Sequence, residues 1–208
     1  TAPRSKIGCF IRMRLSETEG MTMRKVAMLM IEGFEESETL TITDLLRRCG
    51  IQCDLFYFDT PFVKGMQGMW IEGDLPFGEI VEEYDMIVLP GGRPGGQNLL
   101  DHPDVIAMVQ TFDKQGKEIG AMCSGTIVLE QAGVIHGRSV TGYRGYAEKL
   151  GSGTFLEKVV VSDKNLITSQ GPATPYPFAF EIARKLGVDP TNVIEKTLFS
   201  LVVDHVNA

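Results

Sequence analysis

Residues 25–31 read KVAMLMI, a run in which every residue after Lys25 is apolar. The run ends at Glu32 and Gly33, so it has the length of a strand rather than of a helix. Its apolar residues do not alternate with polar ones, so both faces of the strand should be buried, as in a parallel sheet covered by helices. KVAMLMI therefore predicts the first strand of a parallel sheet.

Strand-like and helix-like segments alternate after this run. In chain order they are a helix over 36–49, a strand over 51–58, a strand over 86–90, a helix starting near Asp101, a strand over 118–122 and a helix from Ser124. This alternation predicts an α/β fold with a mostly parallel central sheet and helices on both faces.

The remaining segments give weaker patterns. Residues 60–80 predict a hairpin or an irregular excursion, and strands are expected over 139–143, 158–162 and 165–169. A helix follows, with Ala179, Ile182, Ala183 and Leu186 on one face. The last helix begins at about Asp189 and has Ile194, Leu198, Leu201 and Val202 on one face. A short turn separates 158–162 from 165–169, so these two strands are expected to form a β-hairpin. The apolar stripe of the last helix should pack on the core or on a second subunit.

Composition excludes several classes of protein. With 208 residues, of which 43% are hydrophobic, the chain can bury one good core. A net charge of -7 makes nucleic acid an unlikely partner. No apolar run approaches the roughly 18–20 residues that span a bilayer, and the four cysteines show no disulfide or metal-ligand spacing. We therefore expect a soluble protein of a reducing compartment, the cytoplasm, with no bound metal.

Residues 1–22 differ in character from the rest, because Arg4, Lys6, Arg12 and Arg14 precede any acidic residue. Three interpretations stay open: an artificial or misassigned extension, a presequence for import into an organelle, or a folded element. We expect a single domain over residues 23–208 and leave the leading segment out of the fold prediction.

Three loops should meet at the carboxyl ends of the strands, where ligands bind in such sheets: EGFEESE (32–38), PGGRPGG (90–96) and MCSG (122–125). Cys123 would lie at the first turn of its helix, where the helix dipole should lower the pKa of the thiol, as in a nucleophile elbow with cysteine in place of serine. Alternatively, Cys123 is a small buried filler.

The other two loops offer a proton carrier and hydrogen-bond donors. At least two of Glu35, Glu36 and Glu38 are explained as first-turn acids of a helix, but one could share a proton with the thiol as a general acid or base. The glycine-rich loop lacks the spacing of a phosphate-binding motif, so it is either a plain connection or part of an oxyanion hole with the N–H groups of residues 123 and 124. His102, His136 and His205 lie away from the strand ends, so no Cys–His dyad is visible.

Several motifs together resemble one family. They are EGFEESETL (32–40), YDMIVLPGG (84–92), GAMCSGTIVLEQAG (120–133), TSQGPAT (168–174) and FAFEIARKL (178–186). In this order they are similar to the ThiJ/PfpI superfamily, in the branch that holds the Parkinsonism-associated deglycase and its bacterial chaperone-like relatives. The resemblance implies a flavodoxin-like α/β sandwich, usually dimeric, that needs no cofactor.

The resemblance also implies roles for individual residues. Cys123 would be a nucleophilic, oxidation-sensitive cysteine, Glu38 its protonated carboxyl partner, and the N–H groups of Gly92 and Ser124 an oxyanion site. One position departs from the pattern, because VTGYRGY offers Tyr143 where many members carry a histidine. This departure argues against a protease that relies on a Cys–His pair and leaves Glu38 as the proton carrier.

Two functions follow from this resemblance. The first is a cofactor-independent enzyme, a hydro-lyase or hydrolase, that acts on small α-oxoaldehydes (glyoxalase III type) or on their protein adducts (deglycase). The second is a redox-sensing chaperone in which Cys123 is oxidised to sulfinate, with little catalysis.

Overall fold

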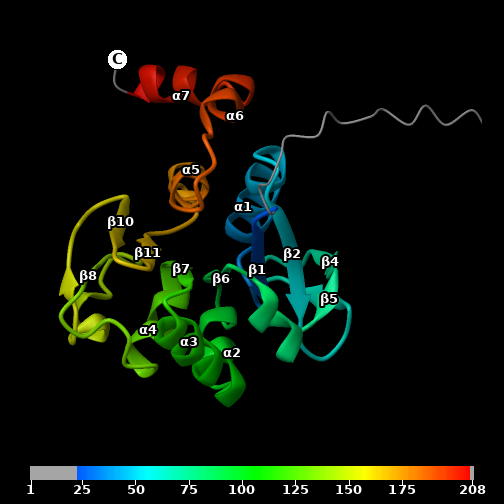
Figure 1. Ribbon diagram of the computed structural model, residues 1–208, viewed down its shortest axis with the longest axis vertical. Helices are drawn as coiled ribbons and strands as arrows, with labels where there is room; N and C mark the ends of the chain where they lie inside the picture. Colours follow the sequence, from blue (N-terminus) through cyan, green and yellow to red (C-terminus); the bar gives the residue numbers. More distant parts are fainter. Residues whose placement is uncertain (1–22, 207–208) are drawn as a thin grey trace, which may run out of the picture.

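A computed structural model describes residues 23–206, so the predictions for residues 1–22, Cys9 among them, lie outside the described part of the chain. The strands of the main sheet are β1 (Lys25–Met30), β2 (Gln52–Tyr57), β5 (Leu75–Pro76), β6 (Met86–Leu89), β7 (Glu118–Met122), β10 (Val160–Asp163) and β11 (Leu166–Ser169). Their order is β10-β11-β7-β6-β1-β2-β5, and only β10 runs antiparallel to its neighbour (Figure 1). The predicted fold class, a mostly parallel sheet between helices, is confirmed.

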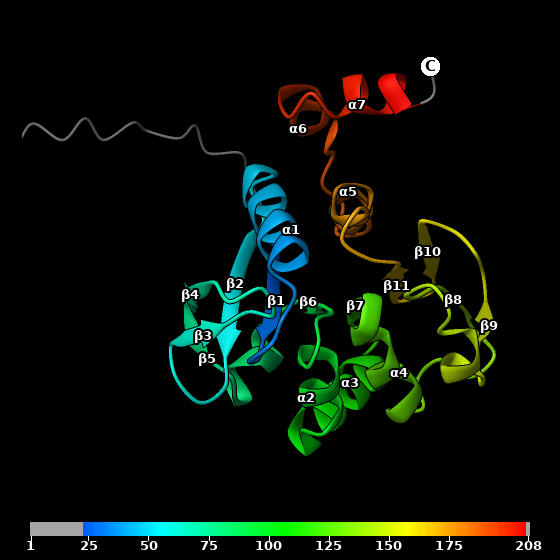
Figure 2. The same ribbon diagram turned by 180° about the vertical axis from the view of Figure 1, so that it is seen from behind.

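Helices bury both faces of the sheet, as the apolar run over residues 25–31 predicted. Along β1, Val26, Met28 and Met30 enter one hydrophobic cluster, and Ala27 and Leu29 enter the other. The first cluster is completed by α1 (Glu36–Arg48) and α5 (Pro175–Lys185), and the second by α2 (Gly95–Leu100), α3 (Pro103–Gln115) and α4 (Ile127–Gln131). Figures 1 and 2 show these two groups on opposite sides of the sheet. A strand that is buried on both faces must be apolar throughout, which explains KVAMLMI.

The register of the central strands brings three loops to one edge of the sheet. Val26 of β1 pairs with Met86 of β6, and Leu89 of β6 pairs with Ala121 of β7, so the three strands end side by side. The backbone N–H of Glu35 donates to Gly91 O at 2.9 Å, which ties the loop after β1 to the loop after β6. The three expected loops therefore meet at the carboxyl ends of these strands.

The excursion over residues 60–80 contains a hairpin, as expected, and also a strand of the main sheet. The hairpin is β3 (Phe62–Lys64) with β4 (Trp70–Glu72), and β5 follows it and pairs with β2. Residues 139–143 form less strand than expected: only β8 (Ser139–Val140) is extended, and it pairs with β9 (Thr154–Phe155) outside the main sheet. The expected β-hairpin of β10 and β11 is confirmed.

Two helix predictions were wrong in detail. The helix α2 begins inside the glycine-rich loop, for which the sequence predicted no helix. The single last helix is in fact two, α6 (Thr191–Lys196) and α7 (Phe199–Val206), because Leu198 between them has a left-handed backbone with φ of 59°. No helix within residues 23–206 is long and apolar enough to cross a membrane.

Candidate functional site

Cys123 lies at a sharp turn between β7 and the helix that follows. Its φ is 54°, a left-handed conformation that costs a residue with a side chain roughly 1–2 kcal/mol. The turn is held by Thr126, whose hydroxyl donates to Cys123 O at 2.7 Å. It also requires glycine at 125, because a Cβ there would lie 2.4 Å from Pro90 O. The sequence thus builds a strained elbow that presents the thiol at the strand ends.

Glu38 is the acid of the first loop that reaches the thiol. Its side chain is fully buried, and its Oε2 accepts the backbone N–H of Gly91 at 2.7 Å. Burial raises the pKa of Glu38 from 4.5 to about 7, against the hydrogen bonds from Gly91 and Cys123, which lower it. Its Oε1 has no hydrogen-bond partner among the described residues. With this pKa Glu38 can carry a proton near neutral pH.

Gly91 is the contact point between thiol and carboxyl. A Cβ at this position would lie 2.6 Å from Cys123 Cβ, 2.9 Å from Cys123 Sγ and 2.9 Å from Glu38 Oε2. Real Cβ atoms do not come this close to their neighbours, so only glycine allows the two side chains to approach each other here. The sequence singled out this loop but not this residue, because no local signal reveals which glycine faces another element.

The expected lowering of the thiol pKa is wrong. Burial, followed by the negative charge of Glu38 when it is ionised, raises the pKa of Cys123, while the N–H groups of Ser124 and Gly92 lower it by a smaller amount. The helix-start argument omitted the buried acid beside the sulfur. The two groups titrate as a unit: below about pH 7 both are protonated, and above it the pair carries one negative charge.

Gly92 and Ser124 present backbone donors to the sulfur. Both N–H groups lower the pKa of the thiol, and Ser124 Oγ donates to Gly92 O at 2.9 Å, which ties the two loops together. Gly92 has φ of 119°, and a Cβ on it would lie 2.2 Å from Gly33 O. Two N–H groups near one reactive atom have the arrangement of an oxyanion hole. Their role in catalysis stays a prediction.

A cavity of about 580 Å³ opens above Cys123. Tyr143 lines it and is 44% exposed, in the place where the family resemblance led us to look for a histidine. None of the three histidines lines this cavity. No cluster of three or more His, Cys, Asp or Glu side chains within residues 23–206 could hold a metal ion. The groups gathered at Cys123 itself are its thiol, the Glu38 carboxyl and backbone donors.

Glu36 shapes one wall of the cavity, a function that the sequence did not reveal. Its buried Oε1 accepts the backbone N–H of Gln67 at 2.7 Å and that of Met69 at 3.4 Å, so it holds the loop of the β3–β4 hairpin. Met66 and Gln67 of that loop line the cavity. The sequence explained at least two of the three acids of this loop as first-turn residues, and only the tertiary fold shows what the Glu36 carboxylate binds.

Comparisons with known proteins agree with the resemblance. Residues 24–185 match the model of the DJ-1/PfpI family. The chain is 34% identical over 185 residues to the glutathione-independent glyoxalase DJR-1.2 of Caenorhabditis elegans, covering 86% of this chain and 98% of that protein. It is 29% identical over 165 residues to the deglycase PH1704 of Pyrococcus horikoshii, covering 78% and 99%. The crystal structure of Drosophila melanogaster DJ-1beta superposes with a TM-score of 0.81 at 30% identity, covering 85% and 98%. With its fold, its elbow and these relatives, the chain belongs to the DJ-1/PfpI family.

Proposed function

We propose that this protein is a cofactor-independent cysteine enzyme that converts small α-oxoaldehydes to hydroxy acids, or releases them from protein adducts. The observation that carries this proposal is the contact of Cys123 and the proton-bearing Glu38 at Gly91. Relatives named glutathione-independent glyoxalase and deglycase support it. Both reactions begin at the same carbonyl carbon, so one site can serve both.

In the first step the sulfur of Cys123 adds to the aldehyde carbon and forms a hemithioacetal. The N–H groups of Gly92 and Ser124 stabilise the oxygen while it carries negative charge, and a proton then neutralises it. Glu38 is positioned to move a proton from this carbon to the neighbouring carbonyl carbon by way of an enediol, which yields a thioester of the 2-hydroxy acid. Water then cleaves the thioester and returns the thiol. The sum is methylglyoxal plus water to lactate, with no external oxidant.

The test is product formation from methylglyoxal without glutathione. We expect the purified protein to release lactate, detected by chiral chromatography, at an unchanged rate after dialysis against a chelator. If no lactate forms, the enzymatic proposal fails.

A second candidate function, redox sensing, rests on the same pair. The buried Glu38 has a free Oε1 and can donate a hydrogen bond to an oxidised sulfur. If methylglyoxal is not turned over while mild peroxide adds two oxygens to the Cys123 peptide, this candidate replaces the enzyme.

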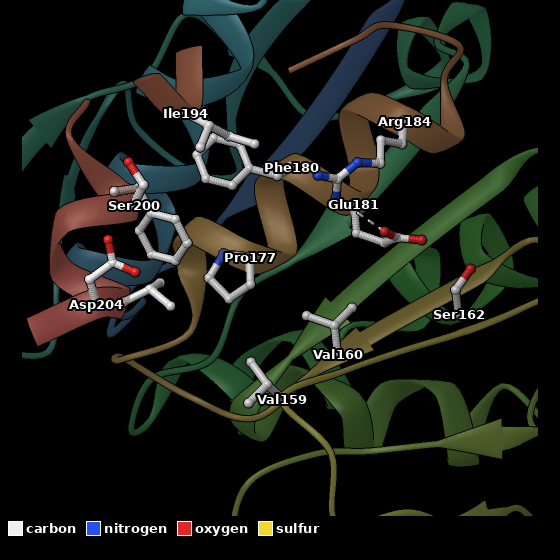
Figure 3. A pocket seen from close by; sticks show the side chains of 12 residues that line it. Val159, Val160, Ser162, Pro177, Phe180, Glu181, Arg184, Ile194, Ser200 and Asp204 are labelled. Atoms are coloured by element: carbon white, nitrogen blue, oxygen red, sulfur yellow. Dashed lines mark ion pairs between the residues drawn. The ribbon is translucent and has the colours of Figure 1, made fainter. Parts of the chain in front are cut away.

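We also propose that two copies of the chain associate through α7. Figures 1 and 2 show α6 and α7 beyond α5, away from the sheet. On this part of the chain Leu201, Val202 and Val206 are 60%, 56% and 76% exposed. Beside them a groove of about 610 Å³ is lined by apolar side chains that include Val159, Val160 and Phe180 (Figure 3). Unpartnered apolar surface of this kind is typical of an interface.

Replacing both Leu201 and Val202 with glutamate should convert a dimer to a monomer, because each change places a charge in an apolar contact. Sedimentation velocity measures the shift. The control is Lys196→Glu, which adds an acid at an exposed, charged position of α6. If the double variant sediments like the wild-type dimer, α7 is not the interface.

The cytoplasm is the compartment that we propose. Cys49, Cys53 and Cys123 are all free thiols, as is usual where glutathione keeps cysteines reduced.

A further inference from the structure

The cavity above Cys123 carries more positive than negative charge, although the whole chain has a net charge of -7. Among the described residues that line it, Arg93 and Lys149 are cationic and Glu35 alone is acidic, while the buried Glu38 behind Cys123 carries no charge below about pH 7. Neither cation forms an ion pair with any side chain within residues 23–206. Two unpaired cations at the mouth of a pocket raise the local concentration of anions.

Glu35 offsets one of these two positive charges, but among the described residues it forms an ion pair with neither cation. Its Oε2 accepts the hydroxyl of Ser37 at 2.7 Å and the backbone N–H of Glu38 at 2.6 Å, and it caps the first turn of α1. The side chain is 8% exposed, so it offers little surface to the cavity. Arg93 and Lys149, in contrast, are both exposed and free to reach a ligand.

Lys149 is held at the cavity by an aromatic side chain. Its Nζ lies 4.2 Å from the centre of the Tyr146 ring, and Tyr146 in turn meets Tyr143 edge to face, with ring centres 5.8 Å apart. All three residues line the cavity. A cation that rests on a ring face keeps its charge available on its other side. This part of the cavity lining is thus an ammonium group positioned on a tyrosine pair.

We propose that Arg93 and Lys149 are specificity residues that select anionic aldehydes, whose negative group is a carboxylate or a phosphate. The aldehyde end reaches Cys123, and the negative group lies between the two cations at the mouth of the cavity. This inference rests on the proposed aldehyde chemistry at Cys123, but the charge selection can be measured without turnover.

The first measurement compares two alkylating reagents that differ in charge, iodoacetate and iodoacetamide. Mass spectrometry of the Cys123 peptide gives the rate constant for each reagent. We expect the ratio of iodoacetate to iodoacetamide rates to fall about three- to fivefold in Lys149→Met and in Arg93→Met, and further in the double variant. The wild-type ratio should also fall as salt is raised, since these charges are exposed.

Arg144→Met is the matched control, because it removes an exposed cation of the same segment that does not line the cavity. It should leave the ratio within about twofold of the wild type, since salt screens an exposed charge outside the cavity lining. If Lys149→Met and Arg93→Met shift the ratio no more than Arg144→Met, the proposed charge selection is wrong.

The second measurement uses substrates. For wild type and variants, kcat/KM is compared between 4,5-dioxopentanoate and its neutral analogue 2-oxopentanal, which form 2-hydroxyglutarate and 2-hydroxypentanoate. The ratio should fall in the two variants, and the same ratio for 2-oxo-3-phosphooxypropanal tells a phosphate from a carboxylate preference. Absence of any product contradicts the proposed function, whereas turnover with unchanged ratios contradicts only the selection of anions.

Discussion

Cys123→Ser lowers kcat/KM for methylglyoxal by about a thousandfold or more. A serine hydroxyl at this elbow is a far weaker nucleophile than sulfur, and it lacks an adjacent base strong enough to ionise it. The variant keeps the small side chain and the left-handed turn, so the free energy of unfolding should change little. Stopped assays of lactate formation measure the loss, and thermal unfolding verifies the fold.

Cys49→Ser is the control for the removal of a thiol. Cys49 ends α1, whose first turn carries Glu38, so it lies about 15 Å along the helix from the site. Burial raises its pKa, so it stays a thiol near neutral pH. Activity within about twofold of the wild type is expected. If Cys123→Ser retains comparable activity, the covalent mechanism is wrong.

Glu38→Gln lowers kcat/KM by about a hundred- to ten-thousandfold and removes its rise with pH. In the wild type the Glu38–Cys123 pair gains its negative charge near pH 7, so activity should rise from pH 5.5 to 8 with an apparent pKa of about 7. Glutamine can still accept the Gly91 N–H but carries no titratable proton. The pH profile therefore separates a proton carrier from a group that only fills space.

The same variant changes how stability depends on pH. Folded Glu38 holds its proton up to about pH 7, whereas the unfolded group releases it near 4.5, so the folded state binds more protons between these values. The stability that Glu38 contributes is thus fully present below pH 4.5 and is lost as pH rises through about 7, a change on the order of 3 kcal/mol. Urea unfolding at several pH values should show this fall in the wild type and its absence in Glu38→Gln.

Glu32→Gln is the control for this measurement, because Glu32 is an exposed acid of the same loop. It should reproduce the wild-type slope of unfolding free energy against pH. A slope that persists in Glu38→Gln would assign the proton to another group and contradict the proposed role of Glu38.

The sequence predicted the sheet because a strand that is buried on both faces is recognisable from its own residues, which are apolar throughout. KVAMLMI and EIGAM are apolar without alternation, and the helices between them have their own periodicity and stop signals. The division of the last helix into α6 and α7 at Leu198 has no comparable signal in the sequence. Its neighbours have ordinary helical spacing, and the break is visible only in the backbone of the folded chain, where φ is 59°.

The site could be predicted in part for a similar reason. Cys123 and the glycine-rich loop stand out because their residue types are unusual at strand ends. The choice of Glu38 among three nearby acids came from the family resemblance, and the raised pKa of the thiol could not be foreseen, since it depends on a residue 85 positions away in the chain. The sequence did not reveal Gly91, Tyr146 and Lys149, because their roles depend on contacts with residues of other elements or with the cavity.

The close approach at Gly91 also bears on how this chemistry can disappear during evolution. A methyl group at this position would overlap both side chains and force sulfur and carboxyl apart, although cysteine and glutamate would both still be present in the sequence. A relative that keeps both reactive residues but carries alanine or serine there is therefore expected to be a pseudoenzyme.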